Sequence, residues 1–283
     1  MAAGAWGRAV RPGQVSVTAQ RVAAHRLTFD RIPARYGDPA ADDALARDVA
    51  AAEVAPGPMR EYLRARTRFF DGVVTGAPGR GFAQIVTGAA GYDGRSLRYA
   101  RPGLVWFEVD HPATQQDKRS RLDRLGIPSG HIRFVAADFS TDPVADRLLS
   151  AGLDPGRPSL FLLEGVAVYL EEAVLRTLLA QLRRVAAGGS SLALSLSVQV
   201  GSPERTARRA AFQATVAALG EPARSTVTAA DAGTLLEATG WQPRETDPGR
   251  SGGRLRPGEP DETGESSAAA RRRSAGFLLA APM

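Results

Sequence analysis

The stretch TGAAGYDG, residues 87–94, closes a short apolar run that starts at Phe82 and decides the fold class. Small residues in a turn after a strand let the backbone approach a bound nucleotide closely, and the amides that follow can face the ligand. Gly-rich turns also join strands to helices where no ligand binds, so this turn alone is a weak signal. A second feature must support it before it predicts a nucleotide site.

The second feature is an acid at the end of the next apolar run, residues 104–109. Asp110 follows the glycines at roughly the twenty-residue spacing of ribose-binding acids. A carboxylate there can accept hydrogen bonds from both ribose hydroxyls. Glu108 points to the same side by strand alternation, but Asp110 lies nearer the carboxyl edge, where ligands bind in parallel sheets. The turn and the acid together predict nucleoside binding.

Apolar runs and helical patterns alternate along the rest of the chain. Strands are expected over residues 82–87, 104–109, 132–135, 159–163, 192–198, 241–245 and 275–280. Helices are expected over residues 40–54, 59–75, 113–125, 142–151, 171–187, 203–219 and 229–239. Such alternation is typical of a doubly wound sheet. We therefore predict an α/β, Rossmann-like fold with a mostly parallel seven-stranded sheet and helices on both faces.

The 283 residues suit one domain with added segments. We expect an irregular arm over residues 1–20 and a single domain over 21–283. Its parts would be amino-terminal helices (21–75), a core (76–245) and a final strand (275–283). Residues 246–274 are polar and rich in Gly, Pro, Ser and Arg. They have too few large apolar side chains for burial to offset the conformational entropy lost on folding. We predict that this stretch is disordered.

Composition limits the expected cellular location of the protein and the classes of partner that it can bind. The chain has no cysteine, which excludes disulfides and cysteine-ligated metals, and we predict no metal site. No apolar run approaches a membrane span, and residues 1–20 lack the apolar segment of a secretory signal, so we expect a cytoplasmic protein without a membrane partner. The net charge of +6 comes from arginines scattered among acids, and few aromatics accompany them. We therefore expect no nucleic-acid partner.

The turn also fits the TGxxGxxG pattern of extended short-chain dehydrogenases, which bind a nicotinamide cofactor. Those enzymes carry the turn near the amino terminus and use a Tyr-x-x-x-Lys pair for proton transfer. Here the turn starts only at Thr87, and the residue four positions before Lys118, the only lysine, is Thr114. A hydride-transfer function would lack its acid, but an NAD(P)-dependent oxidoreductase stays as an alternative.

Four blocks together resemble the leucine carboxyl methyltransferase family, which includes the protein phosphatase methyltransferases and a bacterial branch. They are RARTRFFD (64–71), GAAGYDGR (88–95), FEVDHP (107–112) and EGVAVYL (164–170). The resemblance covers about residues 20–200 and the final strand. It implies a class I methyltransferase fold, S-adenosyl-L-methionine as cofactor, and a lid formed by the helices of residues 21–75.

Position by position, the resemblance implies a cofactor site. Arg66 would pair with the methionyl carboxylate, which suits a guanidinium. Ala89 and Gly91 would line the methionyl and ribose region, and Asp110 would hold the ribose hydroxyls. The sequence departs from the family's usual Gly-Ala-Gly, because Ala89 stands at its first glycine, and from the usual Asp-Thr-Arg, because Gly94 replaces the threonine.

Three further residues complete this set. Asp138 and Phe139 follow the third expected strand and would contact the adenine, although this segment could equally be a simple helix cap. Glu164 ends the fourth expected strand and would lie beside the reaction centre. The alternative is that Glu164 only faces solvent at the end of the strand. We assign no catalytic residue, and no role as a base to any of the histidines.

The resemblance implies O-methylation of a small-molecule carboxylate or hydroxyl, with secondary metabolism as the expected setting. A carboxylate has a pKa near ~4 and needs no base at neutral pH, whereas a phenol or alcohol would profit from one. The other alternative is a non-catalytic nucleotide-binding module. The presence of Arg66, Asp110, Asp138 and Glu164 speaks against it, while Ala89 leaves it open. The sequence does not identify the acceptor or the oligomeric state.

Overall fold

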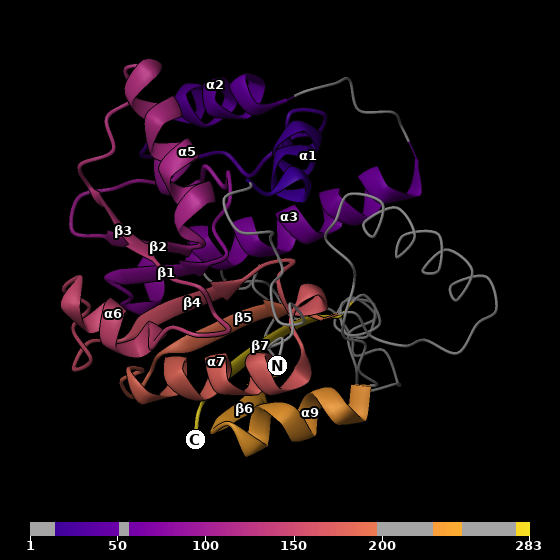
Figure 1. Ribbon diagram of the computed structural model, residues 1–283, viewed down its shortest axis with the longest axis vertical. Helices are drawn as coiled ribbons and strands as arrows, with labels where there is room; N and C mark the ends of the chain where they lie inside the picture. Colours follow the sequence, from indigo (N-terminus) through magenta and orange to yellow (C-terminus); the bar gives the residue numbers. More distant parts are fainter. Residues whose placement is uncertain (1–14, 51–56, 197–228, 245–275) are drawn as a thin grey trace, which may run out of the picture.

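The computed structural model describes residues 15–50, 57–196, 229–244 and 276–283, which form an α/β structure (Figure 1). The expected helix 203–219 and the stretch 246–274 that we predict to be disordered lie outside the described residues.

The described residues form one sheet of seven strands. The strands are β1 (Gln84–Gly88), β2 (Val105–Asp110), β3 (Ile132–Ala136), β4 (Ser159–Leu163), β5 (Ser191–Ser195), β6 (Trp241–Arg244) and β7 (Phe277–Pro282). They lie in the order β3-β2-β1-β4-β5-β7-β6. Strands β1 to β5 pair in parallel, whereas β7 is antiparallel to both neighbours. The predicted mostly parallel, seven-stranded sheet is confirmed.

The direction in which strands are added reverses between β1 and β4, which are neighbours in the sheet. In open α/β sheets, ligands bind in the crevice outside the carboxyl ends of the strands at such a reversal. Both strands are buried along their whole length, as expected for central strands covered on both faces. The Gly-rich turn directly follows β1, so it lies at this crevice.

Helices cover both faces of the sheet, as predicted (Figure 1). They are α1 (Val17–Arg26), α2 (Pro39–Val49), α3 (Pro58–Gly76), α4 (Arg95–Arg98), α5 (Pro112–Arg124), α6 (Val144–Ser150), α7 (Glu172–Arg184) and α9 (Ala229–Ala238), with 3₁₀ turns η1 (Pro78–Arg80) and η2 (Ala167–Tyr169). One apolar cluster joins the sheet to α6, α7 and α9, and a second joins it to α1–α5.

Helix α1 corrects the predicted boundary of the amino-terminal arm. Residues 17–20 are helical, because the Ser16 side chain caps the helix by accepting a hydrogen bond from Ala19 N at 3.0 Å. The helix expected over 40–54 begins at Pro39, after an Asp38 cap, and already ends at Val49. The short α4 and the 3₁₀ turns are not predicted by the sequence pattern.

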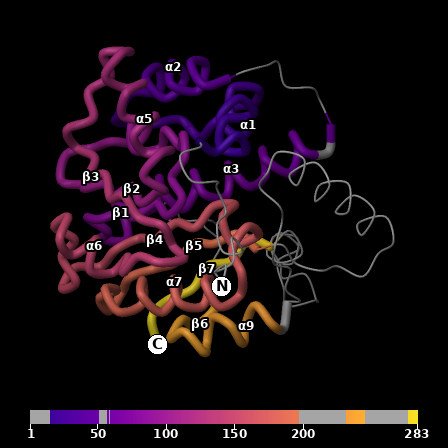
Figure 2. Tube along the Cα trace, viewed as in Figure 1, coloured from indigo at the N-terminus to yellow at the C-terminus, as the bar shows by residue number. Residues whose placement is uncertain are grey.

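The amino-terminal helices lie together, on the opposite side of the sheet from α7 and α9 (Figure 2). Helix α1 packs on both α2 and α3. It also reaches the Gly-rich turn, because a Cβ added to Gly91 would lie 2.8 Å from Cβ of Ala19. Among the residues described, no helix combines the length and apolar character needed to cross a lipid bilayer.

Candidate cofactor site

The Gly-rich turn leaves β1 with two residues in the left-handed region. Ala89 has a φ of 52° and Gly91 a φ of 50°. Glycine adopts such values freely, whereas the Cβ of alanine crowds the backbone there. Ala90 N donates a hydrogen bond to Val109 O at 3.2 Å, which ties the turn to β2. The backbone at Ala89 therefore gives a physical reason for the glycine usual at this place in the resembling family.

Asp110 closes the turn from the end of β2. Its Oδ2 accepts a hydrogen bond from Gly91 N, and its Oδ1 accepts one from His111 N at 2.6 Å. Burial raises the pKa of Asp110 to about 6, although these two backbone hydrogen bonds act in the opposite direction. A carboxylate has about four acceptor positions, so each oxygen keeps one for a ligand hydroxyl.

Glu108, the other acid of β2, has a different environment. It is buried, its Oε1 accepts from Ser96 Oγ at 2.6 Å, and its Oε2 pairs with Lys118 Nζ at 2.6 Å. Lys118 Nζ also donates to Asp93 O at 2.6 Å. Glu108 therefore holds the interior together, and Asp110 alone of the two faces the turn, as the sequence argument preferred.

The segment after β3 brings Phe139 toward the turn, whereas the contacts of Asp138 are local. The ring of Phe139 approaches Gly88, with Cζ 3.7 Å from where a Cβ on Gly88 would lie. Asp138 Oδ1 accepts a hydrogen bond from Ser140 N at 2.9 Å, and Asp138 N donates to Asp142 Oδ2 at 2.8 Å. These contacts match the local cap that the sequence left as an alternative for Asp138.

Arg66 reaches across from α3 to the end of β4. Its Nε donates to Glu164 Oε1 at 3.0 Å, and the residue is only 8% exposed. Gly165, with a φ of 70°, gives the guanidinium its space, because a Cβ there would lie 2.8 Å from Nη1. Arg66 is therefore a buried arginine, although it lies on a helix, and the solvent-facing strand end that the sequence left open for Glu164 is wrong.

Three arginines surround Glu164. Arg26 Nη2 lies 3.2 Å from Oε2, Arg95 Nη1 also bonds this oxygen, and Arg66 holds the other. Burial alone would raise the pKa of Glu164, but the guanidinium groups of Arg95, Arg26 and Arg66 hold it below its usual value. Glu164 is thus a buried carboxylate that stays charged, next to a cation that could face a second carboxylate.

A sequence profile described as leucine carboxyl methyltransferase matches residues 16–183. The chain belongs to the leucine carboxyl methyltransferase family. The family prediction made from the four blocks is therefore confirmed.

Curated relatives agree with this family. A protein from Mycobacteroides abscessus named "Putative S-adenosyl-L-methionine-dependent methyltransferase" is 35% identical over 207 residues, which cover 68% of each chain. A protein of the same name from Mycolicibacterium gilvum is 40% identical over 135 residues, which cover 47% of this chain and 43% of that protein. The match with the second relative therefore spans less than half of its length.

Solved structures share the fold. The crystal structure of a "putative methyltransferase" from Thermobifida fusca YX matches with a TM-score of 0.56 at 20% identity and covers 96% of both chains. A DUF574 family protein from Streptomyces avermitilis MA-4680 matches with a TM-score of 0.55 at 19% identity, covering 94% of this chain and 97% of that one. The class I methyltransferase fold is confirmed. Neither the oxidoreductase nor the non-catalytic module gains support from these matches.

Several buried charged residues of this family member were not identified from the sequence. Arg95 Nε lies 2.7 Å from Asp71 Oδ1, and Arg95 Nη1 lies 2.5 Å from Asp93 Oδ2. Arg31 Nε pairs with the other oxygen of Asp71 at 2.7 Å. Asp71, Asp93 and Arg95 lie inside the blocks that resemble the family, which was a signal for them. Arg26 and Arg31 lie outside those blocks and carried none.

Gly94, the departure from the usual Asp-Thr-Arg, has a structural reason. A Cβ on Gly94 would lie 1.9 Å from Asp42 Oδ1 of α2. Asp42 is held in place by Arg98, whose Nε lies 2.5 Å from Oδ2, and by Arg31 at 3.2 Å. In this chain, the acid of α2 occupies the space that a side chain at position 94 would need.

The histidines differ in their surroundings. His131 Nε2 lies 2.8 Å from a backbone oxygen, and His111 caps α5. His25 Nδ1 is buried and has no hydrogen-bond partner among the described residues. Burial lowers the pKa of His25, and the charges of Arg60 and Arg66 lower it further. His25 is therefore neutral at pH 7 and lies within the electrostatic reach of Arg66.

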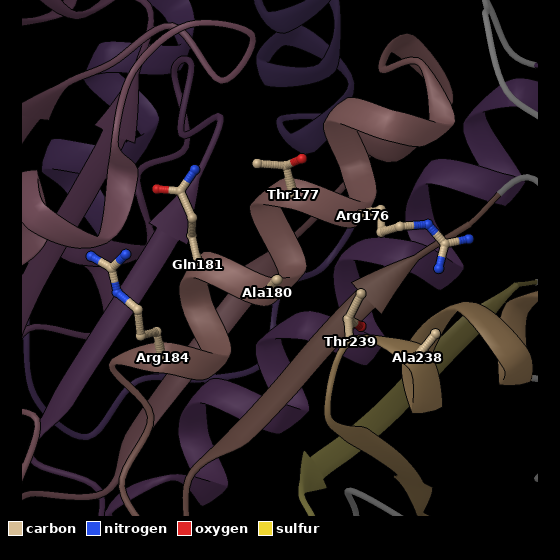
Figure 3. Close-up of a pocket in the computed structure, with 7 residues that line it drawn as sticks. All are labelled: Arg176, Thr177, Ala180, Gln181, Arg184, Ala238 and Thr239. Carbon is tan, nitrogen blue, oxygen red and sulfur yellow. The ribbon is translucent and has the colours of Figure 1, made fainter.

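A separate hollow of about 430 Å³ lies on the outer side of α7 (Figure 3). It is lined by Arg176, Thr177, Ala180, Gln181, Arg184, Ala238 and Thr239. Its residues come from α7 and the end of α9, whereas the candidate site is built from the turn after β1 and from the ends of β2 and β4. This hollow therefore contributes nothing to the cofactor site.

Proposed function

We propose that this chain transfers a methyl group from S-adenosyl-L-methionine to an oxygen of a small-molecule carboxylate or hydroxyl, in secondary metabolism. The observation that carries the proposal is the arrangement at the strand reversal. A tight turn and Asp110 stand at the ends of β1 and β2, and the Arg66–Glu164 ion pair stands at the end of β4. These groups match a nucleoside on one side and an amino acid on the other.

The residues fit this cofactor at both ends. The acceptor positions left on Asp110 suit two ribose hydroxyls. The α-amino acid part carries one carboxylate and one ammonium group, and Arg66 and Glu164 offer the opposite charges for both. We infer that Ala89 and Gly91 line the path between these ends, and that Asp138 and Phe139 meet the adenine.

When bound, the cofactor supplies a methyl group on a positively charged sulfur. A nucleophile attacks the methyl carbon in line with the C–S bond, and the sulfur is the leaving group. The chain itself would bind, align and keep water out. We propose that α1–α3 form the lid, because Ala19 touches Gly91 and Arg26 touches Glu164 from α1. A carboxylate acceptor needs no base. A hydroxyl acceptor would need one, and His25, which is affected by the charge of Arg66, is the candidate.

The test is a calorimetric titration of the full chain with S-adenosyl-L-methionine, with NADPH in parallel. We expect micromolar binding of S-adenosyl-L-methionine and none of NADPH. Asp110→Ala should weaken binding at least tenfold, because the ribose hydroxyls lose a charged acceptor. Glu172→Ala is the matched control, since Glu172 is an exposed acid on α7 whose carboxylate pairs with Arg176.

Binding of NADPH in place of S-adenosyl-L-methionine would overturn the proposal. Equal losses in Asp110→Ala and Glu172→Ala would show that the site lies elsewhere. A single-domain organisation, a cytoplasmic location and the lack of a nucleic-acid partner stay predictions of the sequence.

A further inference from the structure

Tyr62 is an exposed aromatic residue beside the proposed cofactor site. It stands on α3 about one turn before Arg66, whose guanidinium carbon lies 5.6 Å from the centre of the Tyr62 ring. Arg66 in turn bonds Glu164 through its Nε at 3.0 Å. An aromatic surface is thus continuous with the ion pair at the end of β4.

The position of Tyr62 is fixed by aromatic packing. Its ring centre lies 5.8 Å from that of Phe277, and Phe277 stacks on Phe69 with ring centres 5.5 Å apart. Phe277 opens β7 and pairs with Ser195, which ends β5, so this group lies at the same sheet edge as Glu164. Phe69 and Phe277 are buried, but Tyr62 stays 37% exposed. One part of the Tyr62 ring is therefore supported while another is open.

The charges around Tyr62 favour an anion. Arg60 and Arg64 lie two positions before and after Tyr62 on α3, so their side chains leave the helix on other sides, and both lie 3.6 Å from Glu61. With Arg66 included, this stretch of α3 carries three positive charges and one negative charge. An open aromatic ring in a positive surrounding suits a ligand that combines a planar ring with a carboxylate.

We propose that Tyr62 forms a wall of the acceptor site and that the acceptor is an aromatic carboxylate. Its ring packs on Tyr62, and its carboxylate turns toward the end of β4, within the positive field of Arg66, whose guanidinium stays with the methionyl carboxylate of the cofactor. This inference rests on the proposed function. An oxygen of the carboxylate attacks the methyl carbon, and the C–S bond breaks with its electron pair on sulfur. The products are a methyl ester and a neutral thioether, and no proton has to move.

The experiment compares two probes on the full chain loaded with S-adenosylhomocysteine, phenylacetate with a ring and hexanoate without one. We expect calorimetry to show phenylacetate binding about three- to tenfold more tightly, the range that aromatic packing supplies. Tyr62→Ala should remove this preference, and Tyr62→Phe should keep it. Tyr36→Ala is the matched control, because Tyr36 is also exposed and also lies under arginines.

Each outcome decides the inference. Failure of phenylacetate to bind, equal binding of both probes, or a preference that survives in Tyr62→Ala would overturn it. Loss of the preference in Tyr36→Ala as well would also overturn it, because the effect would not be local. S-Adenosylhomocysteine binding, measured first in each variant, separates a failure of the proposed function from a failure of the aromatic acceptor. If the unaltered chain binds it but shows no preference, only the aromatic acceptor fails; if the unaltered chain does not bind it, the proposed function itself fails.

Discussion

The two faces of the sheet are stabilised by different contacts. Under one face, α7 buries Leu175, Leu178, Leu179 and Leu182 in an apolar cluster. Above the other, α1–α5 bury many charged side chains, and among the described residues none of the buried charged ones belongs to α6, α7 or α9. Apolar packing tolerates exchanges of similar volume, whereas a buried charge needs its own partner. The charged part of the candidate site, Arg66 and Glu164, belongs to the side that depends on partners.

The largest effect should come from breaking a pair on the charged face. Asp71→Asn leaves Arg31 and Arg95 without their shared carboxylate, which should lower the free energy of unfolding by about 3–5 kcal/mol. Leu179→Ala on the apolar face should lower it by about 2–5 kcal/mol. Urea unfolding at pH 7.5 measures both.

The pH dependence of these two losses separates the faces. Burial would raise the pKa of Asp71, but the charges of Arg95 and Arg31 hold it below its usual value. The stability from ionised Asp71 is therefore complete above the unfolded pKa, near ~4, and disappears as the pH falls through the lowered folded pKa. The loss in the free energy of unfolding caused by Asp71→Asn should become smaller only in that acid range. The loss caused by Leu179→Ala should not change with pH. Identical pH profiles would contradict the pairing.

A methyl group in the crowded part of the charged face should have the next largest effect. Gly94→Ala forces the new Cβ against Asp42 and should lower the free energy of unfolding by about 1–3 kcal/mol. Gly188→Ala, where nothing lies within 4 Å of the added Cβ, is the matched control and should leave stability nearly unchanged. Equal thermal shifts in the two variants would mean that Asp42 does not occupy this space.

Cofactor affinity should depend on the ionisation of Asp110. With a pKa of about 6, this carboxyl is mostly ionised at pH 7.5. At pH 5.5 only about a quarter of it is ionised, so S-adenosyl-L-methionine should bind about fourfold more weakly there. Glu164 should not add to this change, because its pKa is lowered. Calorimetry across this range tests the expectation, and a constant dissociation constant would contradict it.

The smallest expected effect is at Ala89. Ala89→Gly removes the strain of a left-handed alanine, while the freer unfolded chain offsets part of the gain, so the net stabilisation should be about 0.5–1 kcal/mol. Thermal unfolding measures it. A lower melting temperature would show that the alanine side chain makes contacts worth more than its strain.

The fold could be predicted because its strands are apolar runs separated by turns. β4, with the sequence SLFLL, is buried throughout and has no competing interpretation. Asp110 could be chosen over Glu108 because the carboxyl edge of a parallel sheet is where ligands bind. Helix α1 was harder, because its sequence VTAQRVAAHR shows no clear apolar stripe and its start depends on the Ser16 cap.

Much of the charged face could not be predicted. Arg95 is 1% exposed, yet an arginine in a sequence is normally taken to face solvent. Its burial depends on Asp93, two residues before it, and on Asp71 and Glu164, which come from α3 and from the end of β4. The two distant partners are brought to Arg95 only by the fold, so its local sequence does not predict that it is buried.

The position of β7 has a consequence for the order in which this sheet is completed. β7 lies between β5 and β6, and β6 pairs with no other strand among the described residues. A ribosome delivers β6 and α9 first and residues 277–282 afterwards. Until those residues have emerged, β6 has no place in the sheet, so a growing chain carries an unpaired strand edge until synthesis has reached β7.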